Sequence, residues 1–349
     1  MVTALKVPPL HHPTNLGAVN PLHVMPSMSN DLARVETELL DSVTSSEEFL
    51  TEIASHLITA GGKRVRPGFT IAAAATALAD DTAAIAEAVT GGVAVELVHL
   101  GSLYHDDVMD EAEMRRTVDS VNARWGNLKA ILAGDFLLSR ASELAASLGV
   151  EVAALLANCI GRLCEGQLLE LQWTFKTDRS EDVYLRSIDG KTAALLAAST
   201  RIGALVAQVP TEQVEALTVF GHSYGMAFQI VDDVLDLVSN EEALGKPAGH
   251  DIEEGVYTLP ALVALAGPDG NQLRELLIEG IAPAEQAQAI NLIRSGDGIP
   301  TAISRAREFA VMGSDAIASL PPSPGVTGLT AAAEYLLSNV EAAAAQATA

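Results

Sequence analysis

Hydrophobic residues recur every three or four positions through most of the chain between residues 31 and 239, a spacing typical of one face of an α-helix. Short turns with glycine or polar residues interrupt this pattern, and no proline occurs between Gly68 and Val209. We find no run with the alternation that predicts a β-strand. The pattern therefore predicts helices at 31–58, 68–79, 83–110, 128–147, 150–174, 180–188, 190–207 and 211–239.

The two ends of the chain depart from this pattern. Five of the 15 prolines lie within the first 26 residues, which predicts an irregular N-terminal arm over residues 1–30. After residue 239 we expect shorter helices, and PPSPG at 321–325 interrupts the chain before a last, alanine-rich helix. Residues 31–349 are expected to form a single all-α domain, built as a helical bundle.

Composition and charge narrow the class of function. Hydrophobic residues make up 49% of the chain and aromatic residues 4%, which favours packed helices over sheets. The net charge of −24 argues against nucleic acid as a partner, because phosphate backbones require a broad basic surface. Cys159 and Cys164 are spaced poorly for a disulfide framework or a zinc site. With no signal-peptide pattern, the expected location is cytoplasmic.

A basic loop, GGKRVRPG at residues 61–68, lies between two expected helices, and its glycines and proline favour an exposed turn. Its spacing is not that of a P-loop. Lys63, Arg64 and Arg66 place three cations within four residues, and arginine binds phosphate through two N–H groups. The loop is a candidate diphosphate site, although a solvated basic loop has the same composition.

An acidic triad ends the apolar stretch LVHLGSLYHDDVMDEAEMRR at residues 97–116. Asp106, Asp107 and Asp110 are spaced so that all three can project to one side of a helix. Grouped carboxylates repel unless they share a cation, and Mg²⁺ takes oxygen ligands while leaving positions open for water and phosphate. A solvated acidic helix face has the same spacing, so this motif alone leaves both interpretations open.

The same spacing recurs 126 residues later in FQIVDDVLD, residues 228–236, where Asp232, Asp233 and Asp236 again lie inside an apolar segment. A second copy makes a chance acidic surface a poor explanation. Two such triads in a helical bundle suggest opposing walls of one cavity.

Together these motifs resemble those of the trans-polyprenyl diphosphate synthases. The resemblance rests on GGKRVRP, LVHLGSLYHDDVMDEAEMRR, KT at 191–192 and FQIVDDVLDLVSNEEALGKPAGHDIEEGVYTLP, and it covers about residues 33–320 in the family's order. It implies the all-α class I isoprenoid (terpenoid) synthase bundle with a central cavity. It also implies head-to-tail condensation of isopentenyl diphosphate with an allylic diphosphate, commonly by a homodimer, with a peripheral membrane contact for product release.

The resemblance also implies the residues that act on the allylic diphosphate. Three Mg²⁺ ions, which Mn²⁺ could replace, would be held by Asp106, Asp107, Asp110, Asp232, Asp233 and Asp236. Of these, all but Asp236 are also expected to be catalytic, together with Lys191. Arg115 and Lys246 would assist at the same diphosphate.

Isopentenyl diphosphate would occupy a second site, which the resemblance assigns to Lys63, Arg66, His99 and Arg116. Thr192 and Gln229 would lie near the reacting carbons and a metal-bound water. Tyr104 and Phe228 are expected to be packing residues only.

The sequence departs from the family at one position. Many members read GKxTLP where this chain reads GVYTLP, so Val256 occupies a lysine position. A cation near the second triad is therefore missing, which leaves Lys246 as the nearer candidate and predicts altered phosphate affinity without loss of activity.

Product length is predicted from the residues that precede Asp106 by five and four positions, Gly101 and Ser102. They lie about one helical turn below the metal site, where the family places a bulky aromatic that stops the growing tail. Both side chains are small here, which predicts a long product of about six to ten isoprene units. Close helix packing at Gly101 is the alternative interpretation.

Three other functions fit parts of the sequence. An HD-type metal phosphohydrolase would use His99, His105 and Asp106 but leaves the second triad unexplained. Terpene cyclases share the first triad but usually carry a different second metal motif. A non-catalytic partner subunit that binds prenyl diphosphate would have little reason to keep both triads and the basic loop.

Overall fold

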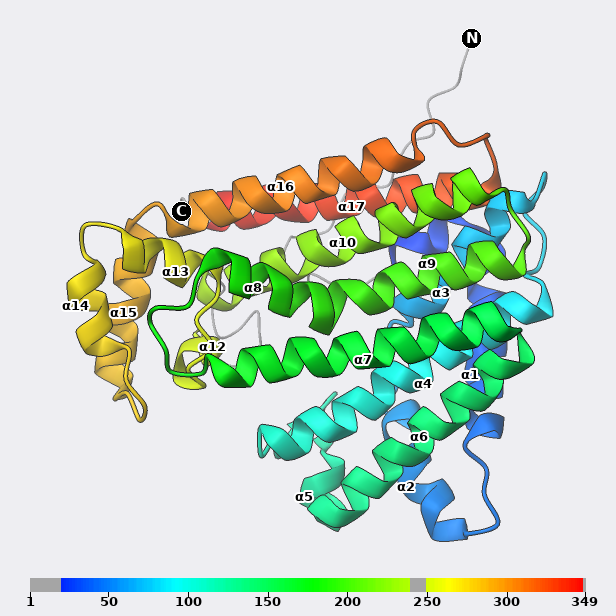
Figure 1. Cartoon of the computed structure of the whole chain (residues 1–349), viewed down its shortest axis with the longest axis horizontal. Coiled ribbons are helices and arrows are strands. Elements are labelled where there is room, and N and C mark those ends of the chain that lie inside the picture. The colour runs from blue at the N-terminus through cyan, green and yellow to red at the C-terminus, as the bar shows by residue number, and fades with distance from the viewer. Residues whose placement is uncertain (1–19, 239–248, 348–349) are drawn as a thin grey trace.

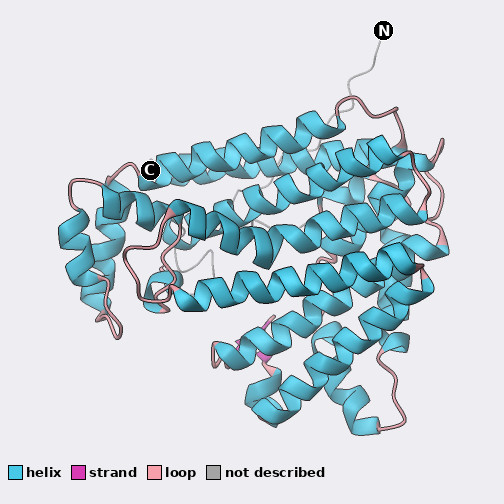
Figure 2. Ribbon diagram, viewed as in Figure 1, coloured by secondary structure: helices cyan, strands magenta, loops and turns pink. Residues whose placement is uncertain are grey.

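A computed structural model describes residues 20–238 and 249–347 of the chain. The described chain is almost entirely helical, so the predicted all-α fold is confirmed (Figure 2). Lys246, which the sequence assigned to the allylic diphosphate, lies outside the described residues.

The elements keep the order that the hydrophobic pattern predicts (Figure 1). They are η1 (Pro21–Val24), α1 (Met28–Ser42), α2 (Glu48–Thr59), α3 (Val65–Ala74), η2 (Ala75–Ala77), α4 (Ala86–Met109), β1 (Met114–Arg115), β2 (Val118–Asp119), α5 (Val121–Trp125), α6 (Asn127–Ser147), α7 (Val150–Gln172), α8 (Glu181–Ile188), η3 (Asp189–Ala193), α9 (Ala194–Val206), α10 (Thr211–Val238), α12 (His250–Glu253), α13 (Leu259–Ala266), α14 (Gly270–Leu276), α15 (Pro283–Ser295), α16 (Gly298–Ile317) and α17 (Pro324–Ala347).

The helix expected at 31–58 is two helices, α1 and α2, so this prediction was wrong. The chain leaves the helical path after Val43, where three hydroxyl residues follow one another. The Thr51 hydroxyl accepts from the Ser45 amide, and the Ser45 hydroxyl accepts from the Glu47 amide. Side chains that bond the nearby backbone in this way compete with helical hydrogen bonds.

The last residues of the expected N-terminal arm are ordered. Residues 20–30 include η1 and the start of α1. Leu22, Met25 and Met28 are buried in the main hydrophobic core. These apolar side chains fix the segment against the bundle despite the prolines around it.

A short hairpin follows α4, although no strand was predicted. β1 and β2 pair antiparallel through Met114 and Asp119 and through Arg115 and Val118. Arg116 and Thr117 form its turn with φ angles of 52° and 67°, the left-handed conformation of a tight hairpin turn. Side chains rarely adopt this conformation without compensation, and here the turn directs Arg116 back toward α2.

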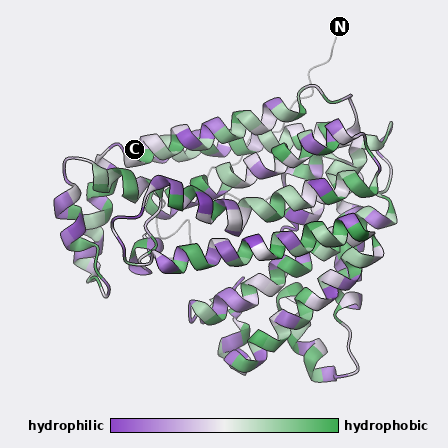
Figure 3. Ribbon diagram, in the orientation of Figure 1, coloured by the Kyte–Doolittle hydropathy of each residue, from purple (hydrophilic) through white to green (hydrophobic). Residues whose placement is uncertain are grey.

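The core is organised around α4 and α10, whose apolar faces are buried along most of their length. Helix α10 packs against α9 and α16, and α4 packs against α3, α6 and α9. Figure 3 shows hydrophobic residues distributed through these long helices. Helices α13, α14 and α15 pack on one another as a smaller group at one end of the molecule (Figure 1). Both aspartate triads lie at the C-terminal ends of α4 and α10.

One described helix, α7, meets the length and hydropathy of a membrane-crossing segment. Helices of soluble proteins meet the same criteria, so composition alone does not assign it to a membrane. Its outer face and that of α6 carry exposed apolar side chains, including Leu128, Leu132 and Leu168.

Candidate active site

Two cavities are lined by predicted site residues. The first, which we call the acidic cavity, has a volume of about 590 Å³, and its lining includes Asp110, Glu170, Arg179, Lys191, Asp233 and Asp251. The second, which we call the basic pocket, has a volume of about 470 Å³, and its lining includes Lys63, Arg64, Arg66, Glu96, His99 and Arg116. Of the sequence-predicted residues, Asp110, Lys191, Thr192, Gln229 and Asp233 line the acidic cavity, whereas Lys63, Arg66, His99 and Arg116 line the basic pocket.

The first triad does not behave as three equivalent carboxylates. Asp107 is fully buried, and its Oδ1 accepts from Arg115 Nε at 2.7 Å and Nη2 at 2.6 Å. Asp110 is exposed at the acidic cavity, and Asp106 is partly buried. Burial raises the pKa of Asp106 to about 6 and also raises the pKa of Asp110. Repulsion from neighbouring carboxylates adds to both shifts. Asp107 therefore holds Arg115 in place, whereas the pair four residues apart is the one suited to bind a cation.

The second triad is similarly divided. Asp233 is 5% exposed, and its carboxylate accepts from the Tyr184 hydroxyl at 2.5 Å and from Gln229 Nε2 at 2.8 Å. Thr192 extends this network by donating to Gln229 Oε1 at 2.7 Å. Burial nevertheless raises the pKa of Asp233 to about 7. The predicted positions Thr192 and Gln229 are thus in contact with each other and with the second triad.

The other two aspartates of this triad are more open. Asp232 is exposed and Asp236 is partly buried. Asp236 accepts from the Asp251 backbone N–H at 3.3 Å, which ties the end of α10 to α12. Asp232 also lies close enough to the basic loop to favour the charged form of Lys63, which opposes the lowering of its pKa by burial.

A break in helical geometry presents Lys191. Residues Asp189–Ala193 form a π-helical turn, η3, between α8 and α9, a feature often found at functional sites. Lys191 Nζ lies 2.5 Å from Glu170 Oε1 on α7. Burial opposes the charge of Lys191, but Glu170, Asp106 and Asp110 raise its pKa, so the ammonium group stays charged. This cation lines the acidic cavity together with Asp110 of the first triad and Asp233 of the second.

The position of each triad in its helix is unfavourable for negative charge. Each is at a helix C-terminus, where the helix dipole disfavours carboxylates. Within residues 20–238 and 249–347, no three His, Cys, Asp or Glu side chains are grouped closely enough to form a metal site alone. Mg²⁺ is commonly held by one or two carboxylates together with water and substrate phosphate. The carboxylates with raised pKa values fit such a shared ion better than an all-protein cage.

Sequence reasoning missed several acidic residues of this cavity. Glu170 on α7 pairs with Lys191, and Asp251 and Glu254 line the cavity from α12 and the residue after it. Burial, followed by Asp233 and Asp236, raises the pKa of Asp251 well above its usual value. Asp251 lies within the GHDIEEG segment of the resemblance, which was the available signal. Glu170 had none, because nothing local distinguishes it from other acids on α7.

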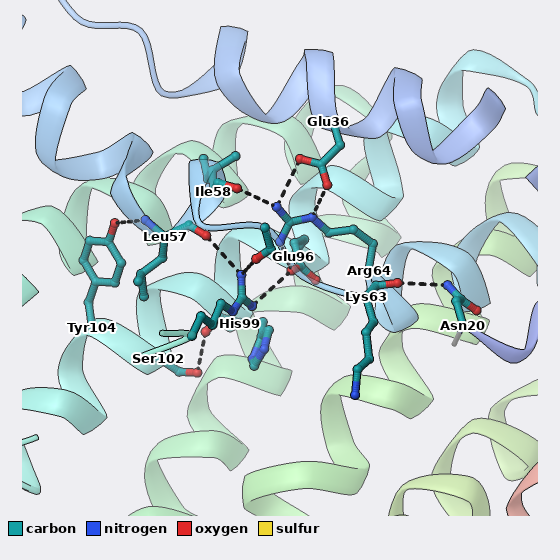
Figure 4. A network of polar contacts seen from close by, with 12 residues as sticks. Asn20, Glu36, Leu57, Ile58, Lys63, Arg64, Glu96, His99, Ser102 and Tyr104 are labelled. Atoms are coloured by element: carbon teal, nitrogen blue, oxygen red, sulfur yellow. Dashed lines mark hydrogen bonds and ion pairs between the residues drawn. The ribbon is translucent and has the colours of Figure 1, made fainter. Parts of the chain in front are cut away.

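Arg64 is a structural residue of the basic pocket. Its guanidinium lies 2.5 Å from Glu36 and 2.9 Å from Glu96, and it also donates to the Ile58 carbonyl at 3.0 Å. Figure 4 shows this cluster, with Lys63 extending away from it on the opposite side of the loop. The buried acid Glu96 thus neutralises Arg64, whereas no ion pair of Lys63 or Arg66 is found within the described residues.

The remaining predicted cations of the basic pocket converge on one wall. Arg116 donates to the Leu57 carbonyl at 3.1 Å and to the Gly61 carbonyl. Burial, with Arg66 and Arg116 nearby, holds the pKa of His99 well below its usual value, so its imidazole is neutral. Arg66 and His99 both line the pocket. A neutral imidazole among arginines can donate one hydrogen bond to an anionic ligand without adding charge.

The predicted chain-length positions differ in their surroundings. Gly101 is buried against α6, and a Cβ at this position would lie 3.1 Å from the Gly134 carbonyl oxygen and 3.2 Å from Leu138. Close helix packing therefore accounts for glycine here. Ser102 is partly exposed, and its hydroxyl donates to the His99 carbonyl at 2.9 Å. Of the two positions, Ser102 is the one with room for a side chain to vary.

The structure also separates residues that other interpretations would combine. His105 faces α6, near the Ile131 carbonyl and Asp135, whereas His99 faces the basic pocket, so the HD-type arrangement is not formed. Tyr104 is fully buried and donates to the Ile53 carbonyl, as expected of a packing residue. Phe228 is 40% exposed and lines the basic pocket, so its assignment to packing was wrong.

Comparison with known proteins agrees with this arrangement. Residues 47–293 match the polyprenyl synthetase family. The chain is 40% identical over 310 residues to the nonaprenyl diphosphate synthase of Mycobacterium tuberculosis, covering 88% of this chain and 92% of that protein. It is 42% identical over 277 residues to heptaprenyl diphosphate synthase component 2 of Geobacillus stearothermophilus, covering 78% and 84%.

A solved structure has the same fold. The polyprenyl synthase of Caulobacter crescentus, crystallised with calcium and isoprenyl diphosphate, superposes with a TM-score of 0.83 at 34% identity, covering 93% of this chain and 98% of that one. The chain therefore belongs to the polyprenyl synthetase family. Its activity is that of a polyprenyl diphosphate synthase, a prenyltransferase.

Proposed function

We propose that this enzyme condenses isopentenyl diphosphate with an allylic diphosphate and makes a long-chain, all-trans polyprenyl diphosphate. The allylic diphosphate would bind in the acidic cavity, between the C-terminal ends of α4 and α10, and isopentenyl diphosphate in the basic pocket. The observation that carries the proposal is that predicted site residues line two separate cavities, one rich in carboxylates and the other rich in cations.

Mg²⁺ fits the acidic cavity because carboxylates are hard oxygen donors and because the raised pKa values of Asp106 and Asp110 would be lowered by a bound cation. Asp106 and Asp110 would hold it on one wall, and Asp232 and Asp236 on the other. When bound, the metal neutralises the charge that develops on the leaving diphosphate. Asp107 and Asp233 would act indirectly, through Arg115 and through Tyr184 and Gln229.

The chain's own residues would organise the rest of the reaction. Lys191 and Arg115 would hold the allylic diphosphate as its C–O bond breaks, and Arg66, His99 and Arg116 would hold isopentenyl diphosphate so that its double bond faces the allylic carbon. A carbon–carbon bond then forms, and the proton lost from the new chain passes to the departed diphosphate. Apolar walls would exclude water from the carbocation.

Incubation with labelled isopentenyl diphosphate and each allylic primer in turn tests this proposal directly. With Mg²⁺ we expect labelled products of about six to ten isoprene units, and with EDTA none. A product that stops at fifteen carbons would contradict the long-chain assignment, and metal-independent turnover would contradict the shared-metal site.

We further propose that the exposed apolar faces of α6 and α7 join two copies of the chain. Leu128 is 80% exposed, Leu132 is 64% exposed and Leu168 is 57% exposed, which is costly for apolar side chains in water. Light scattering at micromolar concentration should give a dimer. Leu132→Glu should weaken it, whereas Met312→Glu on the exposed side of α16 should not. An active wild-type monomer would overturn this assignment.

The Geobacillus relative is named as component 2 of a heptaprenyl diphosphate synthase. This name supports the partner-subunit function as an alternative to be tested. Both triads and the basic pocket are present in this chain, which favours activity without a second component. Turnover by the purified chain alone distinguishes the alternatives, because a dependent subunit would be inactive until its partner is added.

A further inference from the structure

Arg179 is a buried arginine in the wall of the acidic cavity that no sequence motif identifies. It lies in the loop between α7 and α8, directly before Ser180, whose side chain caps α8. Only 5% of its surface is exposed, although it lines the cavity together with Lys191 and Asp233. Its place is therefore among the acidic residues and not on the outer surface.

The guanidinium of Arg179 is poorly satisfied by the protein. Nη1 donates to the Tyr257 carbonyl over 3.4 Å, a long hydrogen bond. Nε and Nη2 are buried and have no hydrogen-bond partner. Among the residues described, no carboxylate forms a salt bridge with Arg179, whereas Lys191 pairs with Glu170. A buried cation in this state is strongly unfavourable, and buried polar groups in native proteins normally find partners.

The surroundings of Arg179 indicate which ligand would accept hydrogen bonds from its unpaired N–H groups. Its guanidinium lies over the ring of Tyr184 at 5.6 Å, and the Tyr184 hydroxyl donates to Asp233 in the second triad. Val256, at the position where the family resemblance implies a lysine, lines the same cavity. Tyr257, which supplies the long hydrogen bond, is the next residue. The arginine and the missing lysine thus belong to one corner of the cavity, beside the second triad.

We propose that Arg179 binds the diphosphate of the allylic substrate and supplies the cation that Val256 does not. The inference rests on the proposed placement of that diphosphate in the acidic cavity. Exchange of the long bond to Tyr257 for phosphate oxygens would give the guanidinium two charge-assisted hydrogen bonds, which are short and strong. The fork of Arg179 would then act on the side of the diphosphate nearest Asp233, opposite Lys191.

A purely structural role for Arg179 makes a different prediction about stability. If the side chain served only to hold the α7–α8 loop, its replacement would lower the thermal midpoint. If it is kept for a ligand, Arg179→Met removes an uncompensated buried charge while retaining apolar contact with Tyr184. The ligand-free variant should then melt at or above the wild-type midpoint.

The experiment measures binding of an unreactive allylic analogue, farnesyl thiolodiphosphate, with Mg²⁺ and without isopentenyl diphosphate. Calorimetry compares the wild type with Arg179→Met, Val256→Lys and the double variant. Arg179→Met should bind about ten- to a hundredfold more weakly, the expected loss of hydrogen bonds to a charged group. The double variant should recover most of this loss. Arg186→Gln, on the exposed side of α8, is the matched control and should bind as the wild type does.

Unchanged affinity for the analogue in Arg179→Met would overturn the inference. So would a lowered thermal midpoint in Arg179→Met together with no recovery of affinity in the double variant. Equal losses for the analogue and for isopentenyl diphosphate would also overturn it, because Arg179 borders only the acidic cavity of the two. Failure of the proposed function has a separate signature. In that case the wild type would bind the analogue equally well with EDTA and in the Asp106→Asn variant.

Discussion

Helices α4 and α10 contribute side chains to both the basic pocket and the acidic cavity, yet the two are stabilised in different ways. In the basic pocket the protein itself holds two of the cations, since Arg64 pairs with Glu36 and Glu96 and Arg116 bonds two carbonyls. In the acidic cavity, Asp106 and Asp233 keep pKa values raised to about 6 and about 7. One site is arranged by protein contacts, and the other is completed only by what binds there.

This difference explains why loss of a side chain should have unequal effects in the two sites. A cation of the basic pocket orients a substrate whose own charge does not change in the reaction. A carboxylate of the acidic cavity holds the metal at the bond that ionises, where interactions gained in the transition state act directly on turnover.

The largest expected effect is therefore in the acidic cavity. Asp106→Asn and Asp232→Asn should each reduce turnover by about a hundred- to a thousandfold, because each removes a charge that holds the metal on the leaving group. Steady-state kinetics at saturating substrate checks this, with circular dichroism to confirm that helix content is retained. Near-normal turnover in either variant would contradict a cavity with two metal-binding walls.

The comparison within the first triad sharpens this prediction. Asp107 pairs with Arg115 and is fully buried, so Asp107→Asn should cost less turnover than Asp106→Asn but more thermal stability. If the two variants lose turnover equally and keep equal midpoints, Asp107 is a direct metal ligand like its neighbour.

The cations should separate the two substrates. Arg66→Ala or His99→Ala should raise the KM for isopentenyl diphosphate by about tenfold, the loss of one hydrogen bond to a charged group, with little change for the allylic primer. Lys191→Ala should do the reverse. Initial-rate kinetics with each substrate varied in turn measures both values, and identical effects on the two would mean that the assignment of sites is wrong.

Helix α4 also provides the test of product length, because Ser102 lies between His99 and Asp106. Ser102→Phe should shorten the product by several isoprene units while initial turnover stays within a few-fold of the wild type. Gly101→Phe is a less informative variant, because its side chain would have to displace α6 at Gly134. Chromatography of dephosphorylated products measures the length. Unchanged length in Ser102→Phe would place the gate elsewhere in the bundle.

Much of the fold was accessible from the sequence because long amphipathic and buried helices give a strong periodic signal. Helix α6 begins and ends within one residue of its predicted bounds. The break between α1 and α2 was missed because serine and threonine are tolerated in helices and act here through local hydrogen bonds. The hairpin at Arg116 was missed because two-residue strands carry no alternation, and its turn lacks the usual glycine.

The site shows a similar limit. Motif spacing placed Asp106 and Asp233 on helices, but only packing separates the aspartates that remain to bind a metal from those that hold Arg115 or accept from Tyr184. Glu170 and Arg179 reach the cavity from α7 and the loop after it. Their roles depend on how distant segments pack, which local pattern does not encode.

The smallest expected effect is on the pH dependence of stability. For Asp106 and Asp233 the folded pKa values, about 6 and about 7, lie above the unfolded value, so their contribution to stability is complete below about pH 4. It is lost as the pH rises through 6 and 7. For His99 the folded pKa is lowered, so its contribution is complete above about pH 6.5 and is lost only at lower pH. Between pH 6.5 and 8, the carboxylates alone should lower the stability of the metal-free enzyme.

The thermal midpoint in EDTA should therefore fall by a few degrees between pH 6.5 and 8. A loss of 1 kcal/mol lowers the midpoint by about 2–4 °C in domains of about 150–250 residues. Asp233→Asn should flatten that decline because it removes the group that titrates near pH 7, whereas Asp182→Asn on the exposed side of α8 should leave it unchanged. Mg²⁺ with inorganic pyrophosphate should reverse the decline, since the metal ion favours the ionised carboxylates and pyrophosphate oxygens complete its coordination. A midpoint that stays level or rises over this range without metal would show that the acidic cavity, like the basic pocket, is already compensated by the protein.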